Sequence, residues 1–164
     1  MARMNGRKSR VILGVAVIAL LGGCVSATQQ ITRVEGKKPK EVCVVRHEAV
    51  RAETLEAILE GFKKNGIATR TVSGTYELKH NTWNPKWNPA EIRGCDAIGV
   101  YVANWRWDLA NYMAFANIWM ITPDGSRKIG QATYDAMRVA GTSKFINARN
   151  KLLELVDQMV AGAS

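Results

Sequence analysis

The chain has 164 residues, of which 47% are hydrophobic and 23% charged, and its formal net charge at pH 7 is +9. This length suits a single domain, and no internal repeat, low-complexity tract or second hydrophobic core divides the sequence. The basic residues are unevenly placed, because four of the 23 lie in the first ten positions, where there is no acidic residue.

Residues 1–23 have the pattern of a cleaved export signal. The basic start is followed by eleven uncharged residues, 11–21, whereas a transmembrane helix needs about 20 apolar residues to cross a hydrocarbon core of about 30 Å. A basic end that stays in the cytoplasm is typical of a signal peptide. Its removal leaves 19 basic and 14 acidic residues, a net charge of +5. We therefore expect an exported protein and no nucleic-acid partner, because the compartment is wrong and no dense basic run survives cleavage.

The segment Leu21-Gly22-Gly23-Cys24 resembles the lipobox of bacterial lipoproteins. The resemblance implies diacylation of the Cys24 thiol, cleavage before this residue, and acylation of the new amino group. Acyl chains anchor a protein to a bilayer because each buried methylene contributes about 0.8 kcal/mol. Apart from this covalent lipid we expect no cofactor. By the rule of that family, Val25 in place of an aspartate favours the periplasmic face of the outer membrane over the inner membrane.

Two alternatives remain open for this segment. Val25-Ser26-Ala27 has the small-x-small pattern of an ordinary cleavage site, which would release a soluble protein beginning at Thr28. Otherwise the apolar run would stay uncleaved as an anchor.

Cys43 and Cys95 remain once Cys24 carries lipid, and they form an even pair in an oxidising compartment. A disulfide between them would close a loop of about fifty residues, which the chain-entropy model values at about 4 kcal/mol. We expect this bridge, and two buried free thiols are the alternative.

The mature chain is expected to be a tether followed by one domain. Residues 24–40 are polar and aperiodic and end in the breaker Gly36-Lys37-Lys38-Pro39, so they indicate a tether. Residues 41–164 are then a single periplasmic α/β domain.

The domain begins with a strand, a helix and a strand. Residues 41–46 are a short β-branched run. From Leu55, apolar residues recur at i, i+3, i+4 and i+7, and the helix they predict ends at Asn65-Gly66. Residues 67–72 alternate apolar and polar side chains and indicate a second strand. Residues 73–94, in which Trp-Asn-Pro occurs twice, are expected to form an ordered loop because proline restricts the backbone.

The second half of the domain is mainly β. Alternation predicts strands over 97–107, 113–121 and 127–136, and Asp124-Gly125 suits the hairpin turn between the last two. A final helix is expected over 143–160.

The element order β-α-β-β-β-β-α predicts an α+β two-layer sandwich. Both helices should cover one face of a mostly antiparallel sheet. The first β-α-β is expected to pair in parallel through a right-handed crossover.

The sequence carries no catalytic or metal-binding constellation. Neither His47 nor His80 has a ligand-type partner three or four residues away, and phosphate-loop, dinucleotide and Gly-x-Ser-x-Gly motifs are absent from the sequence. Asp96, Asp108 and Asp135 lie near strand ends, where two carboxylates can hydrolyse a glycoside, although such acids more often cap turns or pair with arginine. We expect no enzyme and no metal, with a hydrolase built on Asp108 or Asp135 as the catalytic alternative.

Aromatic residues concentrate in the middle of the chain and are candidates for binding. Tryptophan and tyrosine suit protein partners and sugar rings alike. The candidates are Trp83, Trp87, Trp105, Trp107, Tyr101 and Tyr112. The alternative is structural: Trp105 and Trp107 fill the core, while Trp83 and Trp87 pin the proline loop onto the sheet. Because Trp105 and Trp107 share one face of a strand, we expect both to be buried or both to be exposed.

The segments 104–110 and 130–136, with the lipobox and the paired cysteines, resemble a group of small Gram-negative lipoproteins with no assigned function. The likeness runs from about Cys43 to Val160 and supplies no catalytic residue. More loosely, the element order is similar to that of periplasmic accessory lipoproteins that bind envelope enzymes or secretion channels, and fold alone does not give function.

The leading hypothesis is a non-enzymatic, membrane-anchored lipoprotein that binds an envelope protein. The alternative is a glycan-binding module for peptidoglycan or lipopolysaccharide sugar that uses the tryptophan-rich loop and strand. A purely structural role also stays open.

Overall fold

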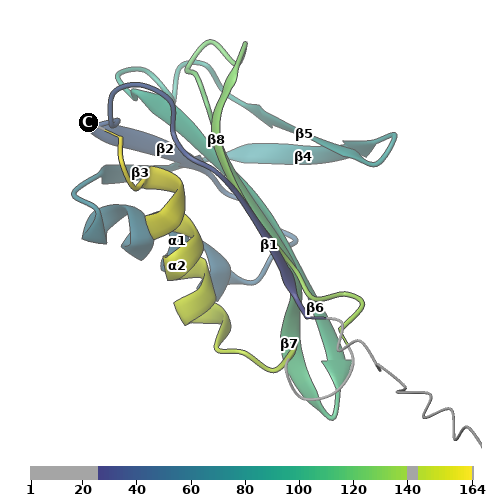
Figure 1. Cartoon of the computed structure of the whole chain (residues 1–164). Coiled ribbons are helices and arrows are strands. Elements are labelled where there is room, and N and C mark those ends of the chain that lie inside the picture. The colour runs from purple at the N-terminus through teal and green to yellow at the C-terminus, as the bar shows by residue number, and fades with distance from the viewer. Residues whose placement is uncertain (1–25, 140–143, 164) are drawn as a thin grey trace, which may run out of the picture.

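The computed structural model describes residues 26–139 and 144–163. Six strands form one mixed sheet, two helices pack together on one face of it, and a two-stranded hairpin lies on the other side (Figure 1). The α+β class with both helices on one face is therefore confirmed. The proposed lipid attachment at Cys24 lies outside the described residues, as does the signal peptide.

The large sheet has the strand order β1-β8-β7-β6-β2-β3. Four of its strands, β1, β8, β7 and β6, pair antiparallel in that order, whereas β2 pairs in parallel with both β3 and β6. The expected parallel β-α-β unit is thus confirmed as β2-α1-β3. The strands are β1 (Thr28–Thr32), β2 (Glu41–Val45), β3 (Ala68–Val72), β6 (Ala97–Asp108), β7 (Ala110–Ile121) and β8 (Lys128–Asp135).

The helix layer consists of α1 (Ala52–Lys64) and α2 (Ala148–Val160). Each helix buries one apolar stripe against the sheet and the other helix. The helices approach closely at Gly61, where an added Cβ would lie 2.9 Å from the Cβ of Val156. A residue without a side chain is therefore required at this contact.

β1 is a strand that the sequence did not predict, and the expected tether is correspondingly shorter. Its residues pair with β8, with Thr28 opposite Asp135. Ile31 is its one large apolar residue, so periodicity is weak there, and the strand depends on β8 for its hydrogen bonds. Further along, Val34 is buried and donates its N–H to the Met159 carbonyl at 2.8 Å. The folded domain therefore includes the chain from Thr28 onward and does not begin at Glu41.

A hairpin of β4 (Gly74–Lys79) and β5 (Thr82–Trp87) occupies the region expected to be an irregular loop. His80 and Asn81, the two residues between the strands, have φ values of 47° and 59°, as a two-residue type I′ turn requires. Pro85 lies within β5, which a two-stranded ribbon tolerates because each strand has a free edge. The predicted element order therefore lacked three strands.

Apolar side chains form a core on each face of the sheet. The helix-facing core includes Phe62 and Tyr101, whereas the opposite core is closed over by Tyr76, Trp83 and Trp87 of the hairpin. The second core also holds Cys43 and Cys95. In the two described ranges, no helix is long and apolar enough to cross a membrane.

The expected disulfide between Cys43 and Cys95 is confirmed. The two residues are disulfide-bonded, with Cα atoms 5.8 Å apart. The bridge joins the centre of β2 to the turn that precedes β6, so it fixes one end of the parallel part of the sheet.

Candidate functional site

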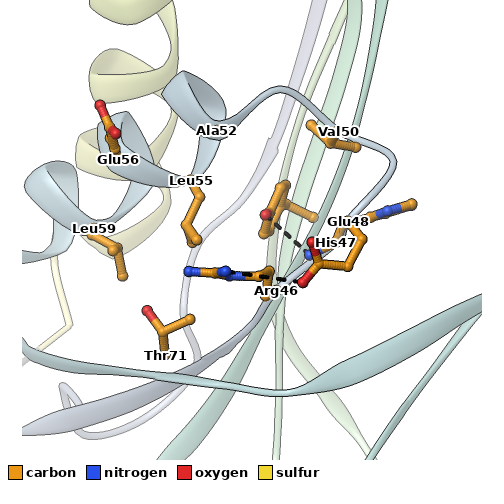
Figure 2. Close-up of a pocket in the computed structure, with 10 residues that line it drawn as sticks. Arg46, His47, Glu48, Val50, Ala52, Leu55, Glu56, Leu59 and Thr71 are labelled. Carbon is orange, nitrogen blue, oxygen red and sulfur yellow. Dashed lines mark hydrogen bonds and ion pairs between the residues drawn. The ribbon is translucent and has the colours of Figure 1, made fainter.

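A first hollow of about 370 Å³ opens where β2 ends and α1 begins. Arg46, His47 and Glu48 follow directly on β2, and Figure 2 shows Leu55 and Leu59 pointing into the hollow from α1. Arg46 and Glu48 approach to 4.0 Å, with side chains 55% and 79% exposed. Such an exposed pair contributes at most about 1 kcal/mol, so the charged rim of the hollow is free to rearrange around an apolar wall.

His47 lies buried beside this hollow and is committed to packing. Its ring stacks on Tyr76 with centroids 4.0 Å apart, and its Nδ1 accepts the Ala49 N–H at 3.3 Å. The Tyr101 hydroxyl accepts the His47 backbone N–H at 3.2 Å, and the Tyr76 hydroxyl donates to the Val45 carbonyl at 2.8 Å. Burial lowers the pKa of His47 and raises the pKa of both tyrosines. The cluster is therefore uncharged near neutral pH.

No catalytic set assembles within residues 26–139 and 144–163. There, neither His47 nor His80 has a side-chain hydrogen bond to a carboxylate, hydroxyl or thiol, and no three His, Cys, Asp or Glu groups are placed to hold a metal ion. Asp96 accepts the backbone N–H groups of Glu41 and Lys40 at 3.0 and 2.7 Å, and these bonds lower its pKa. Asp96 therefore connects the residues just before β6 to the start of β2, which is a structural role.

The two acids suspected for a hydrolase are also engaged structurally. Asp108 forms an ion pair with the nearly buried Lys144. Asp135 accepts the Met137 backbone N–H at 2.8 Å at the end of β8. The two carboxylates thus stabilise two different turns.

A second hollow, of about 340 Å³, lies on the opposite face of the sheet, between the end of the β4–β5 hairpin and strands β6, β7 and β8. Its aromatic lining consists of Trp83, Phe115 and Trp119. Of the three rings, Trp119 is buried whereas Trp83 and Phe115 are half-buried. The two half-buried rings are the ones that present surface to a ligand.

A row of polar side chains borders these rings. Gln131 Nε2 donates to Asn117 Oδ1 at 2.8 Å, and Thr133 Oγ1 donates to the same oxygen at 3.0 Å. Lys128 Nζ donates to Gln131 Oε1. Asn117 and Gln131 are 14 residues apart and meet only through the β7–β8 pairing, so sequence reasoning missed them.

The six predicted binding residues are dispersed. Trp83 and Trp87 are half-buried and hold the hairpin to the sheet, and Trp83 also lines the second hollow. Tyr101 is buried beside the first hollow, and Tyr112 is buried with its ring edge-on to Phe145 at 5.5 Å. Of these four, Trp83 and Trp87 combine partial exposure with a place in a hollow, and Trp87 lines a separate, shallower one beside the start of β4.

Trp105 and Trp107 occupy the same side of β6 in different environments. Trp105 is half-buried beneath Arg51, whose guanidinium carbon is 4.4 Å from the ring centroid. Trp107 is 73% exposed. The expectation that both would be buried or both exposed is wrong, because β6 and β7 continue past the end of the helix layer (Figure 1).

Other exposed apolar residues were not singled out from the sequence. Leu109 is 85% exposed in the turn between β6 and β7, Leu78 is 55% exposed in the β4–β5 hairpin, and Met137 is 38% exposed after β8. The sequence did carry a signal for Leu109. Tight turns between paired strands usually hold glycine or asparagine, and a leucine in that position is unusual.

The comparisons with known proteins reveal a similarity of fold. No protein-family model matches the chain, and no curated protein has a significantly similar sequence. Among solved structures, a PelC dodecamer from Paraburkholderia phytofirmans is similar with a TM-score of 0.53 and 14% identity, over 81% of this chain and 94% of that chain. The dodecamer of a PelC point variant from the same organism gives a TM-score of 0.51 and 12% identity, over 81% and 93%. At such identities the likeness shows that this chain has a PelC-like α+β fold.

Proposed function

We propose that this protein is a non-enzymatic envelope lipoprotein, anchored by lipid on Cys24, that acts by binding protein, including further copies of itself. The observation that carries the proposal is the fold shared, over most of both chains, with a protein solved as a dodecamer. The lipobox resemblance supports the anchor and a place on the periplasmic face of the outer membrane. The Cys43–Cys95 bridge suits an oxidising compartment.

The β4–β5 hairpin supplies a surface for such contacts. Figure 1 shows it projecting from the sheet on the side away from the helices. Leu78 is 55% exposed and pairs across the hairpin with the half-buried Trp83. Glu77 lies between Lys79 and Lys86, with N–O distances of 3.0 and 2.7 Å. An apolar centre within a charged border is the usual anatomy of a protein interface.

Sedimentation velocity of the detergent-extracted full-length protein tests self-association. We expect an oligomer at micromolar concentration. For Leu78→Ser we expect association that is weaker by about tenfold or more, since the few residues at the centre of an interface that dominate its affinity each contribute more than about 1 kcal/mol. Leu109→Ser is the matched control, because it removes a still more exposed leucine that lies outside the hairpin, in the turn between β6 and β7. A protein that stays monomeric at every concentration would contradict the self-association.

A second function, binding of peptidoglycan or lipopolysaccharide sugar, is favoured by the composition of the second hollow. Trp83 and Phe115 offer flat apolar faces, and Asn117 and Gln131 offer amide donors and acceptors beside them. Adding cell-wall fragments should change the tryptophan emission, and Asn117→Ala should weaken that response. An unchanged emission at millimolar fragment concentration would exclude this function.

A further inference from the structure

The β6–β7 hairpin reaches well beyond the start of β1. Across the sheet, Thr28 pairs with Asp135, Asp135 with Phe115, and Phe115 with Asn104. From Asn104 the chain continues for five residues to Leu109 in the turn, which corresponds to about 17 Å of strand. Figure 1 shows this hairpin running past both β1 and α2.

The chain that leads to the lipid attachment site is short by comparison. Cys24 lies four residues before Thr28, and four residues of fully extended chain span at most about 14 Å. The turn at Leu109 therefore reaches as far beyond Thr28 as Cys24 itself can. When the N-terminal end of β1 points toward the membrane, the turn at Leu109 therefore reaches the bilayer surface before the chain between Cys24 and Thr28 would have to be fully extended.

The overhanging end exposes apolar side chains. Trp107 is 73% exposed, Leu109 85% and Met137 38%. Met137 belongs to the same surface as β6, since its Sδ lies 3.9 Å from Nη2 of Arg106. Tryptophan at headgroup depth, with arginine extending toward phosphate, is the composition that membrane interfaces favour.

The backbone of the turn is unfavourable for a leucine at position 109. Leu109 has a φ of 60°, a conformation that glycine and asparagine adopt at lower cost. The turn between β7 and β8 follows that preference, with Gly125 at φ 74°. Residues held in unfavourable conformations gather at functional positions, and Leu109 contributes its side chain to solvent rather than to the core.

The turn is also braced, so it presents these side chains in a fixed place. Lys144 pairs with Asp108 and lies 5.2 Å above the Tyr112 ring, which packs edge-on to Phe145. Because Lys144 compensates the Asp108 carboxylate, Arg106 adds positive charge at this end of β6, on the opposite face of the strand from Trp107. Positive charge attracts the anionic headgroups of a bilayer.

We propose that the β6–β7 turn is a second membrane contact, which inserts Trp107 and Leu109 into the interface of the same bilayer that holds the lipid on Cys24. The inference rests on the lipid anchor of the proposed function. A lipid alone leaves the domain free to swivel, whereas two attachments fix which surfaces face the periplasm.

Fluorescence quenching in vesicles tests this contact. The lipidated full-length protein is reconstituted into phosphatidylethanolamine–phosphatidylglycerol vesicles with and without brominated acyl chains, which quench tryptophan on close contact. We expect quenching in the wild type, its loss in Trp107→Phe, and its retention in the matched control Trp83→Phe. Leu109→Asn, which suits the backbone of the turn but is polar, should reduce the quenching with the fold intact.

The intact mass of the same sample distinguishes a failure of the second membrane contact from a failure of the lipid anchor. A lipidated protein whose quenching is unchanged by Trp107→Phe would overturn the second contact and leave the anchor standing. A protein without lipid would overturn the anchor and this inference together.

Discussion

His47 gives the domain a sensitivity to mild acid. Burial lowers its pKa below the ordinary value of 6.5 in the folded protein, so the unfolded chain binds the proton at a higher pH. The stability that depends on neutral His47 is therefore full above about pH 6.5 and is lost as the pH falls below it. Asp96 and Glu154 have pKa values below their ordinary 3.8 and 4.5, held down by hydrogen bonds from the Glu41 backbone and from Lys151. Their contributions are lost only at a lower pH.

The variant His47→Gln separates the contribution of His47 through stacking from its contribution through titration. We expect the wild-type free energy of unfolding, measured with urea, to fall between about pH 7 and about pH 5. The variant should be less stable at neutral pH, because it loses the stacking on Tyr76, but nearly independent of pH in this window. His80→Gln, at an exposed position, should keep the wild-type slope. Equal slopes in His47→Gln and the wild type would show that His47 is not the titrating group.

At the scale of elements, the contact between the two helices depends on Gly61. Alanine has a better helix propensity than glycine by about 1 kcal/mol, yet its Cβ would lie 2.9 Å from that of Val156. We expect Gly61→Ala to lower the free energy of unfolding by about 1–3 kcal/mol through overpacking, measured by urea denaturation. Glu53→Ala, at an exposed position of the same helix, should change it by less than about 0.5 kcal/mol. If Gly61→Ala is as stable as the wild type, the helices can separate at no cost.

The disulfide joins two cysteines that are 52 residues apart in sequence. The chain-entropy model assigns about 4 kcal/mol to a loop of this length. Replacing Cys43 and Cys95 by alanine should therefore lower the free energy of unfolding by about 2–5 kcal/mol, and adding reductant to the wild type should do the same. A loss below about 1 kcal/mol in both measurements would contradict this contribution.

The elements that the sequence predicted well carry their own periodicity. β6, β7 and β8 alternate over eight to twelve residues, and both helices carry apolar stripes. β1 was missed because its polar residues form a strand only through pairing with β8. The β4–β5 hairpin was missed because Pro85 within it and Pro89 just after it favour a loop. For the site, Trp83 was predictable from its residue type. The Asn117–Gln131 pair was not predictable, because the strand register determines it. The exposure of Trp107 was not predictable either, because it depends on how far β6 and β7 extend past the helices.

At the scale of the whole molecule, the proposed contacts lie at separate ends. The β6–β7 turn, with Trp107 and Leu109, is at one end of the sheet, and the β4–β5 hairpin projects near the other (Figure 1). A domain held by lipid and turn would therefore direct Leu78 away from the bilayer, where a protein partner can reach it. This separation is why Leu78→Ser and Leu109→Ser should affect different measurements.

The intact mass of the protein extracted from the membranes of a Gram-negative host tests the anchor most directly. We predict the mass of the chain from Cys24 plus three acyl chains, lighter by two hydrogens before reduction because Cys43 and Cys95 are bridged. A mass that begins at Thr28, with the protein in the soluble fraction, would contradict the lipid anchor and leave a secreted domain with the same fold.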